Sequence, residues 1–330
     1  MSEACVNMLV FLTINWVTTS TTSEIASGKS KMNPLRRLSL AAASCYLRRS
    51  PVPYGRWRLI KQFLPDLRES GRDLGERVVR TRYGFQYKAD LGDWLGQYVY
   101  LTGVYEPPTA HVIAELLQSG DTFIDVGANS GIFTLLASRR VGPNGRVLSF
   151  EPVPSMRGRI TENLALNRME NVILHGVALS NAVGEITFYE GPQGHKGLSS
   201  MRPIVDVSTT LRVPTIPLDD LVGTTPSVKL IKIDVEGAEQ LVIEGMEKLL
   251  AQQHPFLIIE MTDQYLKAFG HSAEGLSSIL RRTGYKMHKI TPEGLIEIFP
   301  GQANNEPQYN ALFSTCIRND LLQSLSFKHH

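Results

Sequence analysis

The sequence predicts an α/β fold in which a mostly parallel β-sheet carries helices on both faces. From about Glu76 onward, short apolar segments alternate with amphipathic helical patterns, and this alternation is typical of a parallel sheet. The segments are apolar along nearly their whole length, as expected of strands that are buried on both faces. Residues 183–219 break the alternation with a strand-like segment and a stretch rich in Gly, Ser and Pro. This break predicts a β-rich insertion between the third and fourth strands of the sheet.

Turn residues set the boundaries of the elements in chain order. Two strands flank Tyr83 and Gly84, and Pro107 precedes a helix that ends before Gly120. The predicted strands cover residues 77–81, 84–89, 122–126, 147–150, 171–175, 185–189, 229–233, 256–259, 286–290 and 311–314. The predicted helices cover residues 93–105, 109–118, 132–140, 155–167, 238–251 and 277–283.

The composition is that of a globular protein. With 330 residues, the chain has room for about two domains of ~150 residues each. Hydrophobic residues make up 42% and charged residues 20% of the chain, which excludes wholesale disorder, collagen and a coiled coil. A net charge of +2 gives no reason to expect a nucleic-acid partner. The three cysteines lie far apart, so we expect a reducing, cytoplasmic location without a disulfide framework or zinc site.

Basic residues are concentrated near the N-terminus. Residues 25–65 contain nine of them and no Asp or Glu, which leaves 25 basic against 32 acidic residues elsewhere (25 − 32 = −7). We therefore expect residues 1–75 to form a basic extension, partly disordered or helical, and residues 76–330 to form the main domain. The extension is either solvated or in weak contact with an acidic membrane surface. The apolar run at residues 8–17 is too short to span a bilayer, which needs ~20 residues.

A glycine-rich turn follows the strand predicted at 122–126. Its residues are Asp125, Val126, Gly127, Ala128, Asn129, Ser130 and Gly131. In an open α/β sheet such a turn lies at the carboxyl edge, where ligands bind. Gly127 lets the backbone approach a ligand, and the free N–H groups of the following helix favour an anionic group. Asn129 and Ile132 stand where a dinucleotide fingerprint requires glycine, so the pattern suits instead a cofactor with one carboxylate and one amine.

An acidic residue ends the next strand. Glu151 lies 20 positions after Gly131 (151 − 131 = 20), where an acceptor for the ribose hydroxyl groups of a nucleoside cofactor is expected. Its carboxylate can accept hydrogen bonds from both hydroxyl groups at once. The alternative is that Glu151 only caps the helix that begins after Pro152.

These segments, together with others in the same order, resemble the FkbM family of S-adenosylmethionine-dependent methyltransferases. The resemblance covers roughly residues 103–290. It rests on GVYEP at 103–107, IDVGANSG at 124–131, FEP at 150–152, NLALN at 163–167, VALS at 177–180, PLDDL at 217–221, IKIDVEGAE at 231–239, and Glu260. The resemblance implies a Rossmann-like class I methyltransferase fold with a seven-stranded sheet. It also implies S-adenosyl-L-methionine as the cofactor and O-methylation of a hydroxyl group on a small molecule or sugar.

The resemblance further implies which residues contact the cofactor. Tyr105 and Glu106 would approach its amino acid end, and Val177 and Ala178 would lie where the adenine edge is expected. The other cofactor-binding candidates are Asp125, Gly127, Ala128, Asn129, Ser130, Gly131, Glu151, Pro152 and Asp234.

Methyl transfer to a hydroxyl group also needs a residue that removes the proton. Asp234 ends the fourth strand and could act as this base, steady the sulfonium side of the cofactor, or bind a metal. Glu236 and Glu260 are the other catalytic candidates, and Asp234 and Glu260 could converge on Mg²⁺, although we do not expect a metal. Glu236 or Glu239 could instead begin the next helix, where a negative charge suits the helix dipole.

Two other functions stay open. An NAD-dependent oxidoreductase would share the sheet, but Asn129 disfavours the dinucleotide fingerprint. A non-catalytic cofactor-binding module would share the fold, but Asp125, Glu151 and Asp234 are all present. No [DN]-P-P-[YF] motif follows the fourth strand, and the resemblance to methyltransferases implies that its absence argues against amino-methylation of a flipped base.

Overall fold

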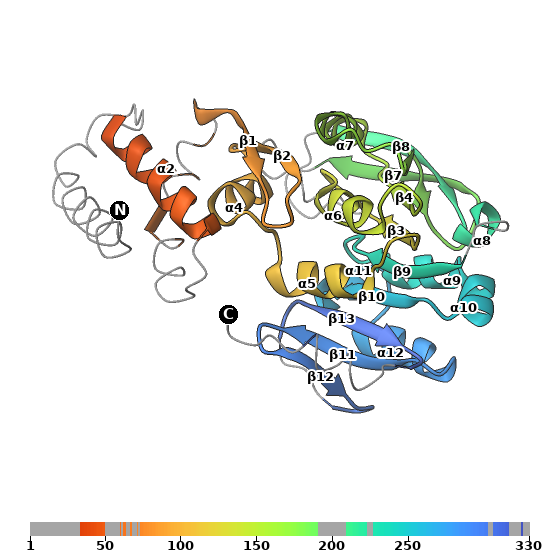
Figure 1. Ribbon diagram of the computed structural model, residues 1–330. Coiled ribbons are helices and arrows are strands. Elements are labelled where there is room, and N and C mark those ends of the chain that lie inside the picture. Colours follow the sequence, from red (N-terminus) through yellow and green to blue (C-terminus); the bar gives the residue numbers. More distant parts are fainter. Residues whose placement is uncertain are drawn as a thin grey trace. The chain divides into compact units, whose positions relative to one another are not determined.

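The computed structural model describes residues 34–49, 73–190, 209–222, 227–302 and 306–316, together with single positions at 60, 62, 63, 67, 71 and 325. The chain divides into two compact units between Tyr105 and Glu106 (Figure 1). The expected domain boundary between residues 75 and 76 falls within the first unit and stays a prediction. The apolar run at 8–17 lies outside the described residues.

The first unit combines helices with a β-hairpin. Its described elements are α2 (Pro34–Arg49), β1 (Glu76–Arg80), β2 (Gln86–Asp90) and α4 (Trp94–Thr102). β1 and β2 pair antiparallel on either side of the turn predicted at Tyr83 and Gly84. Leu40, Ala43 and Leu47 are buried along one face of α2, as their helical spacing requires. No helix among the described residues is both long and apolar enough to cross a membrane.

The second unit is built on a sheet whose strands run in the order β12-β11-β13-β10-β9-β3-β4-β5 (Figure 1). The strands are β3 (Thr122–Val126), β4 (Arg146–Phe150), β5 (Val172–His175), β9 (Val228–Ile233), β10 (Phe256–Met261), β11 (Lys286–Thr291), β12 (Gly294–Ile298) and β13 (Tyr309–Ser314). From β10 to β5 all neighbours are parallel. β10, β13, β11 and β12 pair antiparallel. The predicted fold class is confirmed, with eight strands in this sheet where seven were expected. The additional strand is β12, which was not predicted from the sequence.

Helices cover both faces of this sheet. They are α5 (Pro107–Leu116), α6 (Ile132–Val141), α7 (Pro154–Asn167), α8 (Leu218–Leu221), α9 (Glu239–Glu244), α10 (Glu247–Gln253), α11 (Asp263–Ala268) and α12 (Ala273–Arg282). Ile124 and Val126 of β3 share a core cluster with residues of α9, α10 and α12. Phe123 and Asp125 alternate with them and are buried on the opposite face, where Thr134 of α6 contacts Asp125. The continuous burial of β3 therefore explains why its sequence does not alternate between apolar and polar residues.

The predicted β-rich insertion is present. β6 (Ala178–Leu179), β7 (Gly184–Glu190) and β8 (Thr209–Ile216) form a separate three-stranded sheet in the order β6-β8-β7. β7 and β8 pair antiparallel, and β6 runs parallel to β8. The glycine-rich segment at 191–208 lies outside the described residues.

The single helix predicted over residues 238–251 is wrong. Two helices, α9 and α10, occupy this stretch and are separated at Gly245 and Met246. A Cβ atom at Gly245 would lie 2.0 Å from the backbone oxygen of Ser180. The helix is thus interrupted where the backbone packs directly against the insertion, a contact that helical periodicity cannot reveal.

Candidate functional site

The glycine-rich turn lies at the carboxyl edge of the sheet, as predicted. The N–H groups of Gly127 and Ala128 donate to the backbone oxygen of Phe150 at 3.0 and 3.1 Å. Gly127 has a φ of 79°, and a Cβ atom there would lie 1.9 Å from the backbone oxygen of Asp234. Only glycine allows this approach, and it brings the ends of β3, β4 and β9 together.

Glu151 links the end of β4 to the glycine-rich turn. Its Oε2 accepts a hydrogen bond from the backbone N–H of Asn129, and its Oε1 accepts one from that of Val153, both at 2.8 Å. The contact with Val153 agrees with a capping role before α7, and the contact with Asn129 reaches the predicted ligand site. Burial raises the pKa of Glu151 to about 7. Each carboxylate oxygen has a second lone pair with which to accept from a ligand.

Asp125 anchors β3 to α6 and carries an unsatisfied oxygen. Its Oδ2 accepts a hydrogen bond from the hydroxyl group of Thr134 at 2.6 Å. Its Oδ1 is buried without a hydrogen-bond partner among the described residues, and burial raises its pKa. A buried acceptor without a donor is costly, so Oδ1 is available for a donor group of a ligand.

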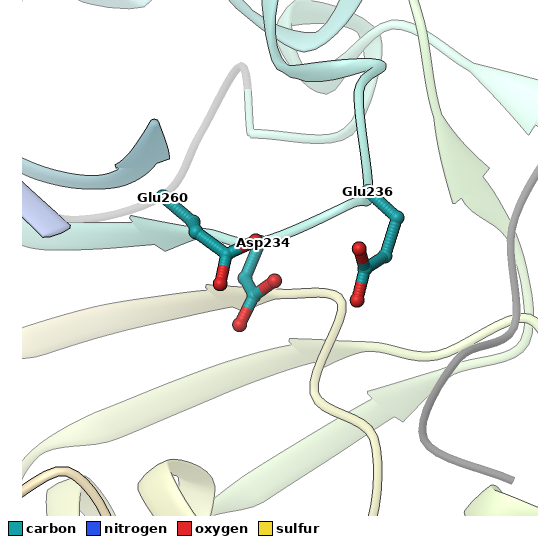
Figure 2. Close-up of side chains that lie close together, drawn as sticks. All are labelled: Asp234, Glu236 and Glu260. Carbon is teal, nitrogen blue, oxygen red and sulfur yellow. The ribbon is translucent and has the colours of Figure 1, made fainter. Parts of the chain in front are cut away.

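Three acidic side chains converge beside this turn. Asp234 follows β9, Glu236 lies in the next turn, and Glu260 belongs to β10. Their oxygen atoms lie within 4.8 Å of one another, and Figure 2 shows the three carboxyl groups gathered beside the ends of these strands. The predicted convergence of Asp234 with Glu260 is therefore present, and Glu236 joins them.

The carboxyl groups of the acidic cluster lose hydration when they are buried. Burial raises the pKa of Glu236 to about 8, with further contributions from the charges of Asp234 and Glu239. Burial also raises the pKa of Glu260 well above its usual value, and Asp234 and Glu236 add to this effect. A carboxylic acid with a pKa near 8, as in Glu236, can exchange protons near neutral pH.

Lys232 provides a buried positive charge. Its side chain is 2% exposed, and its ammonium group donates to Oδ2 of Asp234 at 2.8 Å. Its Nζ also lies 4.8 Å from the ring centre of Phe133. Burial alone would lower the pKa of Lys232, but the charges of Asp234, Glu106 and Asp125 outweigh burial and raise it. The charge of Asp234 is thus already balanced by a protein cation, and the expectation of no bound metal stays a prediction.

Two amide side chains reach the acids from the start of β13 and the residue just before it. Asn310 donates from Nδ2 to Oε2 of Glu106 at 2.9 Å, and Gln308 donates from Nε2 to Oε1 of Glu260 at 2.5 Å. Sequence reasoning missed both amides as well as Lys232. The bond between Asn310 and Glu106 joins residues 204 positions apart, and only the pairing of β13 with β10 brings them near.

Glu239 holds the turn that carries Glu236. Its Oε1 accepts hydrogen bonds from the backbone N–H groups of Val235 at 3.2 Å and Gly237 at 3.1 Å. Its side chain is buried, and burial raises its pKa to about 7. Glu239 does begin α9, as the alternative interpretation expected, while its side chain also stabilises the turn.

The remaining predicted residues are distributed more widely. Ser130, Pro152 and Ala178 are buried, and Ala178 pairs with Thr215 in the insertion sheet. Val177 packs against the core. Tyr105 belongs to the first unit, where its ring meets that of Tyr98 edge-on at 6.3 Å. Cofactor contacts of Tyr105, Val177 and Ala178 stay predictions.

The sheet, the glycine-rich turn and Glu151 define an α/β protein of the class I methyltransferase type. Residues 125–287 match the family described as "Methyltransferase FkbM domain". The chain belongs to this family of methyltransferases.

Two curated relatives carry related sequences. Hexuronic acid methyltransferase AglP of Haloferax volcanii is 31% identical over 158 residues, which cover 47% of this chain and 62% of that protein. Methyltransferase 1 of Beauveria bassiana is 31% identical over 148 residues, which cover 38% of this chain and 59% of that protein. The chain therefore spans less than two thirds of the length of these relatives. Among solved structures, Methyltransferase FkbM from Methylobacillus flagellatus KT is 16% identical with a TM-score of 0.39, covering 77% of this chain and 59% of that chain.

Proposed function

We propose that this protein transfers a methyl group from S-adenosylmethionine to a hydroxyl group on a small molecule or sugar. The observation that carries the proposal is the hydrogen bond from the Asn129 backbone to Glu151. It joins the glycine-rich turn to the acid after β4, beside the acidic cluster at Asp234. This arrangement supports a nucleoside cofactor and a proton acceptor at one edge of the sheet.

The residues fit this cofactor. Glu151 has lone pairs for the ribose hydroxyl groups, and the buried Oδ1 of Asp125 lacks a donor among the described residues. The N–H groups at the start of α6 suit a carboxylate. S-adenosylmethionine supplies a methyl group on a positively charged sulfur: the oxygen–methyl bond forms, the sulfur–methyl bond breaks and its electron pair stays on sulfur. The protein must orient the acceptor and receive the hydroxyl proton.

The acidic cluster supports a hydroxyl acceptor. A hydroxyl group gives up its proton with difficulty, and Asp234, Glu236 and Glu260 supply acceptors for it within one group. The name of the Haloferax relative specifies a hexuronic acid, which is a sugar with several hydroxyl groups. Hexuronic acids are therefore the first acceptors to try.

Calorimetric titration of S-adenosylmethionine into the wild type and Glu151→Ala tests the proposal. Loss of one charge-assisted contact should cost about 1.5–3 kcal/mol, or roughly 10- to 150-fold in affinity. Glu115→Ala, at an exposed position on α5, should bind like the wild type. Release of S-adenosylhomocysteine with glucuronic and galacturonic acid then tests the acceptor class. Binding of NAD in place of S-adenosylmethionine would overturn the proposal, and cofactor binding without turnover on a wider panel of hydroxyl compounds would favour a binding module.

A further inference from the structure

The acids of the site form two groups that share Asp234. The charges that act on Glu106 are those of Lys232 and Asp234. Those that act on Glu260 are mainly those of Asp234 and Glu236, with a weaker contribution from Lys232. The charge of Lys232 thus acts on Glu106 and on Asp125 of the glycine-rich turn. Glu260 lies with Glu236 and Asp234 in the acidic cluster.

Two amide donors, one just before β13 and one within it, contact the two groups. Gln308 immediately precedes β13, and Asn310 is the second residue of that strand. Gln308 donates to Glu260, and Asn310 donates to Glu106. Each amide can donate but has no charge, so it favours the ionised form of its acid and fixes the position of that acid.

The partners of the three clustered acids differ. Oδ2 of Asp234 is already occupied, because it accepts a hydrogen bond from the ammonium group of Lys232 at 2.8 Å. Oε2 of Glu236 is buried without a hydrogen-bond partner among the described residues, which favours its protonated form. Among the described residues, Glu260 accepts one uncharged donor, on Oε1, which leaves Oε2 to receive a proton. Its raised pKa makes its carboxylate, once ionised, a stronger proton acceptor than an ordinary glutamate.

We propose that Gln308 and Asn310 are positioning residues with separate tasks: Gln308 orients Glu260 as the proton acceptor, and Asn310 orients Glu106 on the cofactor side. This inference rests on the proposed function, which assigns Glu106 to the cofactor and Glu260 to the acceptor. In the reaction, the acceptor hydroxyl group would lose its proton to Oε2 of Glu260, and that proton would later pass to solvent. Neither amide exchanges a proton.

The exposure of Gln308 makes the inference testable without disturbing the core. Gln308 is exposed and Asn310 half-buried, and each serves as the matched control for the other. The charged or titratable groups near Glu260 are Asp234, Glu236, Lys232 and, from α11, Tyr265. None of these is changed in either variant.

The first arm uses the protein without ligand. Glutamate side chains labelled with ¹³C at the carboxyl carbon are titrated by NMR, with Glu260→Gln and Glu106→Gln to assign the signals. Gln308→Ala should raise the midpoint of Glu260 and leave that of Glu106 in place, because removal of a donor favours the neutral acid. Asn310→Ala should do the reverse, and Gln252→Ala, at an exposed position on α10, should change neither.

The second arm measures function. Asn310→Ala should weaken the calorimetric Kd for S-adenosylmethionine about 10-fold, whereas Gln308→Ala should keep it within about 2-fold. Turnover of the hexuronic acid probes should fall about 10-fold in Gln308→Ala at saturating cofactor. Equal effects of the two variants on cofactor affinity, or a Glu260 midpoint that Gln308→Ala leaves unchanged, would overturn the inference. Absence of cofactor binding by the wild type would instead overturn the proposed function, while the NMR arm would still decide the roles of the amides.

Discussion

At the scale of single residues, Lys232 has the most demanding environment. A lysine ammonium that is 2% exposed keeps its charge only if acids compensate for lost hydration. Asp234, Glu106 and Asp125 do so, since their combined effect raises the pKa of Lys232 despite burial. The lysine and the acids therefore depend on one another.

Lys232→Met should destabilise the protein strongly at pH 8. Removal of one partner from a buried pair costs about 3–5 kcal/mol, because the carboxylate of Asp234 is left without its cation. The loss should be smaller at pH 5, where neighbouring acids can take up protons. Urea unfolding at both pH values measures the difference.

Lys229→Met is the matched control on the same strand. Lys229 is half-buried beside the ring of Phe256, and its loss should cost no more than about 1 kcal/mol. Equal losses for the two variants would contradict the role given to Lys232.

At the scale of elements, the turn between β9 and α9 determines the shape of the site. Glu236 adopts a left-handed conformation with a φ of 55°, and Gly237 has a φ of 109°. A Cβ atom at Gly237 would lie 2.6 Å from the backbone oxygen of Tyr265. The turn thus combines backbone strain with close packing against α11, and Glu239 holds it in place.

Gly237→Ala should destabilise the protein by at least about 1–3 kcal/mol through backbone strain alone, and the overlap with Tyr265 adds to this. Thermal unfolding measures the effect. Gly158→Ala is the opposite case, because Gly158 lies exposed in α7 with nothing within 4 Å of the added Cβ atom. That change should stabilise the helix by roughly 0.5–1 kcal/mol. An unchanged melting temperature in Gly237→Ala would show that the turn can relax.

Elements were predictable from sequence where local patterns determine them. The strand expected at 122–126 has the bounds of β3, because turn residues flank a continuous apolar run. The glycine-rich turn, Glu151 and the pair Asp234–Glu260 were found because strand ends in a parallel sheet share one edge. In the sequence, Lys232 is only a polar position in a strand. Its role as a buried positive charge depends on acidic residues that only the tertiary structure brings close. Gln308 and Asn310 escaped detection for the same reason, since their partners belong to distant elements.

At the scale of the whole molecule, the buried acids link stability to pH. Burial raises the pKa values of Glu151 and Glu239 to about 7 and that of Glu236 to about 8. The folded state therefore holds protons that the unfolded chain has already lost above about pH 4.5. Stability should fall as pH rises through these values.

The free energy of unfolding should decrease by a few kcal/mol between pH 6.5 and 8.5, at about 1.4 kcal/mol for each proton over each pH unit. Below about pH 6.5 the lowered pKa values of His175 and His288 act in the opposite direction, so the window above it gives the cleaner test. Urea unfolding across this window measures the slope, and Glu236→Gln should make it shallower. A free energy that is constant or rises with pH would contradict the prediction.

The position of β13 has a consequence for synthesis on the ribosome. β13 lies between β10 and β11 in the sheet, but it begins 53 residues after β10 in the chain (309 − 256 = 53). At 5–20 residues per second, translation leaves β10 without this neighbour for roughly 3–10 s. During that interval the growing polypeptide exposes an open, apolar strand edge, which is a site for chaperone capture or aggregation. A messenger RNA truncated before β13 would therefore yield a polypeptide that is degraded or aggregates. It would not yield a shortened, folded protein with weaker cofactor binding.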